Sequence, residues 1–391
     1  MRSIKEANVK GKTVLLRTSF DVPLKNGRIT DDSRIKESIK TIKYLLRNKA
    51  KVLIVAHLGR PKGKEKKFSL KPVFLRLKKL LKVPVVFLPD ILDAKVPEKI
   101  SKLNSKEVVL FENIRFYEEE EKNNFQFAKT IAQLADIFVN NDFPTAHHSN
   151  ASFEAIARYL PSFCGLSFEK EIKELSKIKD NPGHPFVVVI GGIKVSDKIG
   201  VISNLARKAD YILVGGASAN TLFKAEGYKL GDSLIEEKTL GQAFKIIKSV
   251  GEKITLPIDL VISSSLKSKK SQIIDVPSVP SQITNSPSAI YDIGPKTIIK
   301  WEDIIKTAKT IFWSGPLGTF EHPLFSKGTK EIARAISRNS HETVVGGGDT
   351  ISAISHFKIK KFTHISTAGG AMLKYVSGEE LPGIKALARR H

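Results

Sequence analysis

Short apolar runs alternate with amphipathic stretches along the whole length of the chain. The apolar runs are short enough to be buried strands rather than buried helices. Strands are predicted in the first half of the chain at 13–17, 51–56, 85–88, 107–111 and 137–140. In the second half they are predicted at 186–190, 211–214, 254–257, 310–313, 343–345 and 363–366.

Amphipathic helices are predicted between these strands. The clearest examples are 33–48, 70–81, 124–134 and 240–250. Strands and helices that alternate at this spacing predict an α/β fold with doubly wound parallel sheets covered by helices on both faces.

The alternation is interrupted near the middle of the chain. Residues 168–179 are charged and helix-prone, and Asn181-Pro182-Gly183 follows them. The simplest organisation is two lobes connected by a helix. Residues 263–287, rich in Ser, Lys and Pro, are expected to form an exposed meander with short edge strands.

Composition favours a cytoplasmic enzyme. The chain has 391 residues, of which 41% are hydrophobic, and no apolar run approaches the ~20 residues that span a bilayer. The first residues lack the apolar core of a secretory signal. Cys164 is the single cysteine, so we expect a buried structural thiol rather than a disulfide or a metal ligand.

The charge is strongly basic, with 64 Lys and Arg against 40 Asp and Glu and a net charge of +24. Such an excess attracts polyanions, from nucleic acids to phosphorylated metabolites. The lysines are spread along the chain and are not interleaved with aromatic residues. A general compositional bias is therefore favoured over a dedicated nucleic-acid surface.

The segment 187–198, V-V-V-I-G-G-I-K-V-S-D-K, is the most informative. A buried strand is followed by Gly191 and Gly192, and then by the first turns of a predicted helix that carries Lys194 and Lys198 on one face. Two ammonium groups at this spacing repel each other unless an anion lies between them. A solvated lysine pair is the alternative, and the sequence leaves both open.

Further glycine clusters follow strands in the second half of the chain. They are Gly215-Gly216, Gly346-Gly347-Gly348 and Gly369-Gly370. Backbone N–H groups in such turns form anion-binding concavities. Asp349 is either a helix N-cap or a Mg²⁺ ligand. The Walker A and G-x-G-x-x-G patterns are absent, which argues against a P-loop enzyme and a dinucleotide dehydrogenase.

Basic residues follow the predicted strands of the first half. His57 and Arg60 follow one strand, Arg115 follows another and His148 a third, while Arg34 lies at a helix start. Because the carboxyl ends of parallel strands meet at one edge, these residues predict a site for a small anion.

These residues belong to motifs that occur in the order typical of one family. They are D-D-S-R-I, H-L-G-R-P, E-N-I-R-F, G-G-I-K-V-S-D-K, D-I-G-P-K-T, W-S-G-P-L-G-T-F-E, F-S-K-G-T, G-G-G-D-T and H-I-S-T-A-G-G-A. The chain thus resembles a phosphoglycerate kinase from end to end. The resemblance implies two Rossmann-like lobes: 1–167 binding phosphoglycerate and 186–372 binding nucleotide, with a hinge helix at 168–185. The tail, 373–391, would return to the first lobe.

The implied reaction is reversible phosphoryl transfer between 1,3-bisphosphoglycerate and MgADP in glycolysis, with hinge closure between the lobes. By resemblance, Arg34, Lys194 and Lys198 would be catalytic. Substrate would be bound by Ser19, Asp21, Arg34, His57, Arg60, Arg115 and His148. ATP or ADP would lie against Gly191, Gly192, Lys198, Gly215, Gly216, Ser314, Pro316, Glu321, Gly346, Gly347, Gly348, Asp349 and Thr350, with Asp349 holding Mg²⁺. Ser366, Thr367, Gly369 and Gly370 would form a phosphate nest.

Several positions depart from the family pattern. The family's R-V-D-F-N-V-P is R-T-S-F-D-V-P here, so a carboxylate moves from position 19 to Asp21. His148 replaces an arginine, and Asn141-Asp142 stands where the family has Asp-Ala. On the nucleotide side, the departures are Ile193, Ser314 and Ala368, where the family has alanine, asparagine and glycine.

Three functions follow from these observations. The leading one is a monomeric, cytoplasmic phosphoglycerate kinase with small-molecule substrates, no membrane and no dedicated nucleic-acid partner. The second is an acyl-phosphate kinase for a different carboxylate acceptor, motivated by Asp21 and His148. The third is a catalytically weak basic protein that binds nucleic acid, for which salt-dependent binding would be the sign.

Overall fold

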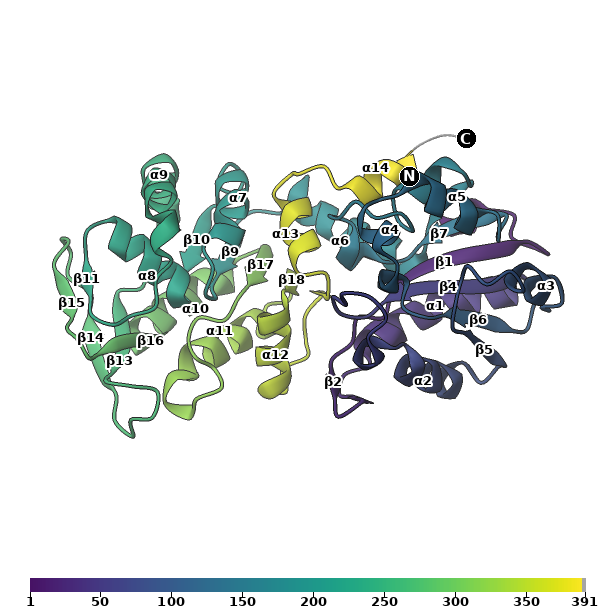
Figure 1. The fold of residues 1–391 in the computed structure, drawn as a ribbon. Coiled ribbons are helices and arrows are strands. Elements are labelled where there is room, and N and C mark those ends of the chain that lie inside the picture. The colour runs from purple at the N-terminus through teal and green to yellow at the C-terminus, as the bar shows by residue number, and fades with distance from the viewer. Residues whose placement is uncertain (389–391) are drawn as a thin grey trace. The chain divides into compact units, whose positions relative to one another are not determined.

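The computed structural model describes residues 1–388, and they form two compact units. Of the described residues, unit 1 consists of Met1–Lys173 together with residues 380–388. Unit 2 consists of Glu174–Glu379. Each unit is built on a six-stranded parallel sheet with helices packed against it, which confirms the predicted α/β fold (Figure 1).

The sheet of unit 1 has the strand order β5-β6-β4-β1-β7-β8. Its strands are β1 (Thr13–Ser19), β4 (Lys51–His57), β5 (Val85–Leu88), β6 (Val108–Phe111), β7 (Ile137–Asn140) and β8 (Ser162–Cys164). Strand β1 is followed in sequence by β4 on one side and later by β7 on the other. The order of the strands therefore reverses at β1, where open α/β sheets place their ligand sites.

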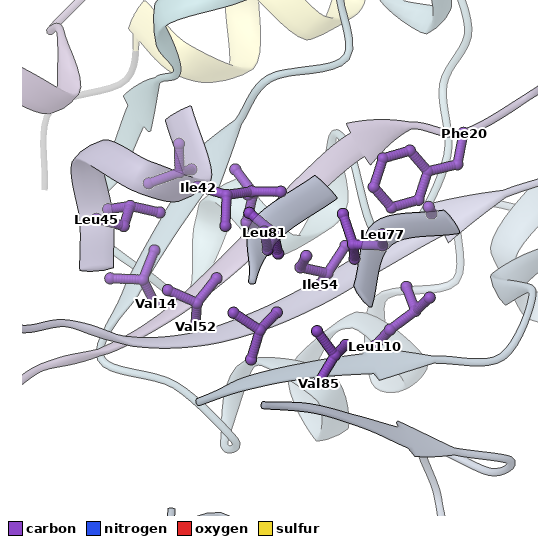
Figure 2. Close-up of a cluster of buried hydrophobic side chains, with 14 of the residues drawn as sticks. Val14, Phe20, Ile42, Leu45, Val52, Ile54, Leu77, Leu81, Val85 and Leu110 are labelled. Carbon is purple, nitrogen blue, oxygen red and sulfur yellow. The ribbon is translucent and has the colours of Figure 1, made fainter. Parts of the chain in front are cut away.

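Helices cover this sheet because their apolar residues recur at helical spacing. They are α1 (Ser33–Arg47), α2 (Lys71–Leu81), α3 (Val96–Ser101), α4 (Glu118–Glu121), α5 (Phe125–Ala132), the start of α6 (Leu166–Lys179), and α14 (Pro382–Ala388). Figure 2 shows Ile42 and Leu45 from α1 with Leu77 from α2 above Val14 and Ile54 of the sheet. Alternate residues of each strand share this face, so the core is continuous.

The sheet of unit 2 has the order β12-β10-β9-β17-β18-β19. Its strands are β9 (Phe186–Ile190), β10 (Tyr211–Val214), β12 (Ile254–Thr255), β17 (Thr310–Ser314), β18 (Glu342–Gly346) and β19 (His364–Ser366). The helices are α7 (Ser196–Leu205), α8 (Gly216–Ala225), α9 (Leu240–Val250), α10 (Pro295–Thr307), α11 (Lys327–Arg338), α12 (Gly348–His356) and α13 (Gly370–Val376). The order reverses between β9 and β17.

Smaller sheets accompany the two main ones. In unit 2, β13 (Asp259–Ser263) pairs antiparallel with β14 (Gln272–Asp275) and β16 (Ala289–Ile293). Strands β11 (Lys229–Leu230) and β15 (Gln282–Thr284) form a pair, as do β2 (Leu24–Lys25) and β3 (Arg28–Ile29) in unit 1. The predicted meander contains β14 and β15, whereas β2, β3, β8, β11, β13 and β16 were not predicted.

Two further features of the structure concern its cysteine and the length and polarity of its helices. Cys164 is buried and unpaired, and burial raises the pKa of its thiol to about 12. Within residues 1–388, no helix is both long and apolar enough to cross a membrane.

Candidate active site

The first set of predicted residues gathers at one edge of the unit 1 sheet. His57 ends β4, Arg115 lies in the turn after β6, His148 follows β7, and Arg34 is the second residue of α1. Because the strands are parallel, these positions meet at the same edge. Arg115, Arg34 and His148 all lie close enough to affect the charge of His57 electrostatically. Arg60 is exposed in the loop that follows β4.

The loop at Gly59 is held by hydrogen bonds with the side chains of Asp21 and Arg115. Asp21 Oδ1 accepts a hydrogen bond from the Gly59 N–H at 2.9 Å, and Arg115 Nη1 donates to the Gly59 carbonyl at 2.8 Å. Arg34 Nη1 donates to the Asp21 carbonyl at 2.8 Å and lies 3.4 Å from Asp21 Oδ2. Asp21 therefore fixes both Arg34 and the loop that carries Arg60.

Sequence reasoning missed a buried charged network behind this cluster. Arg17 on β1 is 1% exposed and forms an ion pair of 2.8 Å with Asp142, which is fully buried. Arg17 Nη2 also lies 3.0 Å from His57 Nδ1. Arg17 Nε donates to Ser152 Oγ at 3.0 Å, and Ser152 in turn donates to Glu120 Oε1 at 2.7 Å. Arg17 could have been recognised from the sequence, because it is a charged residue within an otherwise apolar predicted strand.

Burial shifts the pKa of two members of this network. Burial, followed by the positive charges of Arg17 and Arg115, holds the pKa of His57 well below its usual range. Burial also raises the pKa of Glu120, although Arg17 and the bonds from Ser152 oppose that shift. His57 is therefore a neutral ring at physiological pH.

The second set of predicted residues lies at the carboxyl edge of the unit 2 sheet. Gly191 and Gly192 follow β9, and Ser314 and Pro316 end and follow β17. These loops interlock, because Gly191 N–H donates to the Ser314 carbonyl at 2.9 Å and Gly192 N–H to the Pro316 carbonyl at 2.7 Å. A Cβ at Gly191 would overlap the Pro316 carbonyl, so the close approach requires glycine.

Three more strand ends contribute to this edge. Gly215 connects β10 to Gly216, the first residue of α8, and Gly216 N–H donates to the Leu317 carbonyl at 3.1 Å. Gly346 ends β18, Gly347 follows it and Gly348 begins α12, in which the Thr350 hydroxyl accepts a hydrogen bond from Gly315 N–H at 2.7 Å. Ser366, Thr367, Gly369 and Gly370 connect β19 to α13, with Gly369 at a φ of +49°. The residue with positive φ is thus Gly369, and the neighbouring Ala368 does not need that conformation.

The loops that follow β9, β10 and β17 and the start of α12 border a cavity of about 550 Å³, whereas residues 366–370 are not part of its lining. Of the predicted residues, Gly192, Gly216, Pro316, Glu321 and Asp349 line it. The lining also contains residues that were not predicted. They are the polar residues Asn220, Tyr291 and Asp292 and the apolar residues Leu260, Leu266 and Leu317. Mostly apolar walls with a few polar groups are typical of a site for an aromatic ligand such as a nucleotide base.

Lys194 and Lys198 do not share a helix face, which corrects the prediction. Helix α7 begins at Ser196, so Lys194 lies in the preceding loop and is exposed, whereas Lys198 is 8% exposed. The positive φ of Gly192, +86°, turns the chain before the helix begins. Burial lowers the pKa of Lys198, and the carboxylates of Asp197 and Asp349 partly offset that effect.

Asp349 is not an N-cap. The N-cap of α12 is Gly347, and Asp349 is the second residue of the helix, near Lys198 and at the rim of the cavity. The N-cap prediction for Asp349 is therefore wrong, and its role as a Mg²⁺ ligand stays a prediction.

Comparison with known proteins agrees with this arrangement. The family described as phosphoglycerate kinase matches residues 4–379. The chain belongs to the phosphoglycerate kinase family. It is 46% identical to a phosphoglycerate kinase of Dictyoglomus turgidum, over 98% of this chain and 97% of that protein. It is also 46% identical to one of Thermosipho africanus, over 99% and 98%.

Solved phosphoglycerate kinases have the same fold. The structure from Coxiella burnetii superposes with a TM-score of 0.87 at 38% identity, covering 98% of both chains. The structure from Pyrococcus horikoshii OT3 gives a TM-score of 0.87 at 34% identity, covering 99% of this chain and 98% of that one.

At the sheet edge of unit 1, the sequence of this chain departs from the family pattern described above. Ser19 is buried, and its hydroxyl has no hydrogen-bond partner among the described residues. The carboxylates nearby are instead Asp21, which holds Arg34, and Asp142, which neutralises Arg17. His148 is half-buried and its ring packs on that of His147, with centroids 3.9 Å apart. The moved carboxylates therefore have defined partners.

Proposed function

We propose that this protein is a phosphoglycerate kinase, which transfers a phosphoryl group reversibly between 1,3-bisphosphoglycerate and ADP. In this proposal unit 1 binds phosphoglycerate and unit 2 binds the nucleotide. The observation that carries it is the buried ammonium of Lys198 beside Asp349, at a sheet edge formed by glycine turns. Phosphoryl transfer needs positioning and positive charge around the equatorial oxygens and little covalent work.

The residues divide between the two substrates. We assign the cluster of Arg34, His57, Arg60, Arg115 and His148 to phosphoglycerate, since three arginines can grip carboxylate and phosphate oxygens. We assign the cavity beside Glu321 to the nucleotide base and ribose. The N–H groups at Gly346–Gly348 and at 366–370 would then face its phosphates.

The donor set fits Mg²⁺ as the companion ion. Within residues 1–388, no three His, Cys, Asp or Glu side chains are grouped as an ion cage. Mg²⁺ in phosphoryl transfer is usually held by one or two carboxylates together with substrate phosphates and water. Asp349 would supply the carboxylate, and the ion would neutralise phosphate charge. A monomeric state and a cytoplasmic location are further parts of the proposal.

The test is a coupled steady-state assay with MgATP and 3-phosphoglycerate. We expect saturable turnover that depends on Mg²⁺ and is lost with EDTA. Lys198→Met should reduce kcat by about 10²–10³-fold, because it removes a preorganised charge from the transition state. Lys245→Met, which removes an exposed lysine of α9, is the matched control and should leave kcat unchanged. No turnover despite binding of MgADP would contradict the proposal.

A second candidate function is the same chemistry on another carboxylate acceptor. The observation that favours it is the Asp21 carboxylate, 3.4 Å from Arg34 Nη1, which adds negative charge beside the proposed substrate. This candidate predicts ATP-dependent phosphorylation of a different carboxylate together with poor use of 3-phosphoglycerate. Repeating the assay with a panel of small carboxylates distinguishes the two.

A further inference from the structure

Arg17 touches His57 but is enclosed by other protein groups. Its guanidinium donates to Asp142 Oδ2 and to the Thr18 carbonyl, both at 2.8 Å, and to Ser152 Oγ at 3.0 Å. The remaining contact is that of Nη2 with His57 Nδ1 at 3.0 Å. With 1% of its surface exposed, Arg17 has no access to a ligand.

This contact determines where the proton of His57 lies. A guanidinium has five N–H donors and no acceptor, so Nδ1 of His57 must accept the hydrogen bond. A neutral imidazole that accepts at Nδ1 carries its hydrogen on Nε2. The geometry therefore selects one tautomer of His57 and makes Nε2 a donor.

The surroundings oppose protonation of this ring. An imidazolium would point an N–H at the N–H of Arg17 and would add a cation where Arg34, Arg115 and His148 already lie. Asp142 Oδ2 is 3.8 Å from His57 Nδ1 but already accepts from Arg17 and from the Thr145 hydroxyl, at 2.8 and 2.6 Å. The Asp142 oxygen that lies nearest to His57 in these contacts is thus already engaged by two other donors.

We propose that Arg17 is a positioning residue for substrate binding, which holds His57 as a neutral ring with Nε2–H as a fixed hydrogen-bond donor. The acceptor would be an oxygen of the substrate bound by unit 1, and its identity as phosphoglycerate rests on the proposed function. His57 then fixes the direction of one hydrogen bond to the substrate, and Arg34, Arg60 and Arg115 supply positive charge. Asp142 makes this arrangement possible, because its carboxylate neutralises the Arg17 guanidinium, which is costly to bury as an unpaired charge.

The first test uses the unmodified protein. Two-dimensional ¹⁵N–¹H NMR of histidine-labelled protein distinguishes protonated from unprotonated ring nitrogens. Between about pH 5 and 8, where an ordinary histidine changes its charge, we expect Nδ1 of His57 to stay unprotonated and Nε2 protonated. A protonated Nδ1, or a ring that titrates near pH 6.5, would overturn the inference.

The second test separates positioning from general stability. Arg17→Lys keeps the charge beside Asp142 but lacks the fork that reaches His57. We expect His57 to lose its fixed preference for hydrogen on Nε2, so that both neutral tautomers appear in its spectrum. KM for 3-phosphoglycerate should rise about tenfold, with kcat changed by less than about twofold. Unchanged His57 spectra and an unchanged KM in this variant would contradict the assigned role.

Ser152→Ala is the matched control, because it removes another buried contact of Arg17 and leaves the His57 contact in place. It should lower stability without altering the His57 spectrum. If Arg17→Lys does not fold, the NMR result on the unmodified protein still tests the tautomer of His57. Absence of turnover with 3-phosphoglycerate would overturn the proposed function, whereas a protonated Nδ1 would overturn this inference.

Discussion

Gly192 lies directly beside the ammonium of Lys198, in a backbone conformation that L side chains rarely adopt. A Cβ at Gly192 would lie 3.0 Å from Lys198 Nζ, and the φ of Gly192 is +86°. A side chain there would strain the backbone and displace the ammonium. The glycine after β9 and the buried lysine of α7 therefore act as one structural feature.

Gly192→Ala should reduce kcat by about 10²-fold, because it moves a preorganised charge away from the position it must hold. Steady-state kinetics with MgATP and 3-phosphoglycerate measures the effect. Gly200→Ala is the control within α7, since its Cβ would meet only Ser377 Cβ, at 3.9 Å. It should raise the free energy of unfolding by up to ~1 kcal/mol and leave kcat unchanged. Equal losses of activity in both variants would argue against a specific role of Gly192.

Asp292 should make stability depend on pH. Its oxygens accept hydrogen bonds from Ile293 and Gly328 N–H at 2.9 and 2.7 Å, yet burial raises its pKa to about 8. Between about pH 4 and 8 the folded state then binds a proton that the unfolded state releases. The free energy of unfolding should fall as pH rises through this range, by at most about 1.4 kcal/mol per pH unit from this group.

Asp292→Asn removes the titrating group and should flatten that slope. Urea denaturation at four pH values between 5 and 8 measures the slope in both proteins. The same slope in the variant and the parent would show that Asp292 is ionised in the folded state throughout this range.

His148→Arg should improve substrate binding. Arginine carries a permanent charge and makes two parallel hydrogen bonds to a phosphate or carboxylate, which histidine does not. KM for 3-phosphoglycerate should fall about tenfold, the equivalent of one charge-assisted hydrogen bond. His148→Lys adds a charge without the fork and should produce a smaller gain. An unchanged KM in both variants would place phosphoglycerate binding elsewhere.

Cys164 should be unreactive in the folded protein. It is 1% exposed, and burial raises its pKa to about 12, so little reactive thiolate forms at pH 8. Iodoacetamide should leave the native protein unmodified and alkylate it fully in urea, as measured by intact-mass spectrometry. Rapid modification of the native protein would indicate that β8 opens locally.

Local sequence predicted the main sheets well because their strands are buried on both faces. Strands at 137–140, 186–190 and 211–214 have the predicted bounds, as does the helix at 240–250. Strands β13 and β16 were missed because their apolar runs, 260–262 and 289–291, are only three residues long and lie next to Asp259 and Asp292. Helix α7 begins later than predicted, because the turn at Gly192 continues into the loop that holds Lys194.

The sequence by itself determined the alternation of strands and helices, the glycine turns after strands, and the basic residues that follow the strands of unit 1. Only the tertiary structure decided which distant residues meet. Arg17 contacts His57 and Asp142 because β1 pairs with both β4 and β7, and each strand ends at the same edge. It also decided that Lys198 is buried while Lys194 is exposed. Such relationships depend on strand order, register and solvent exclusion, to which local periodicity is insensitive.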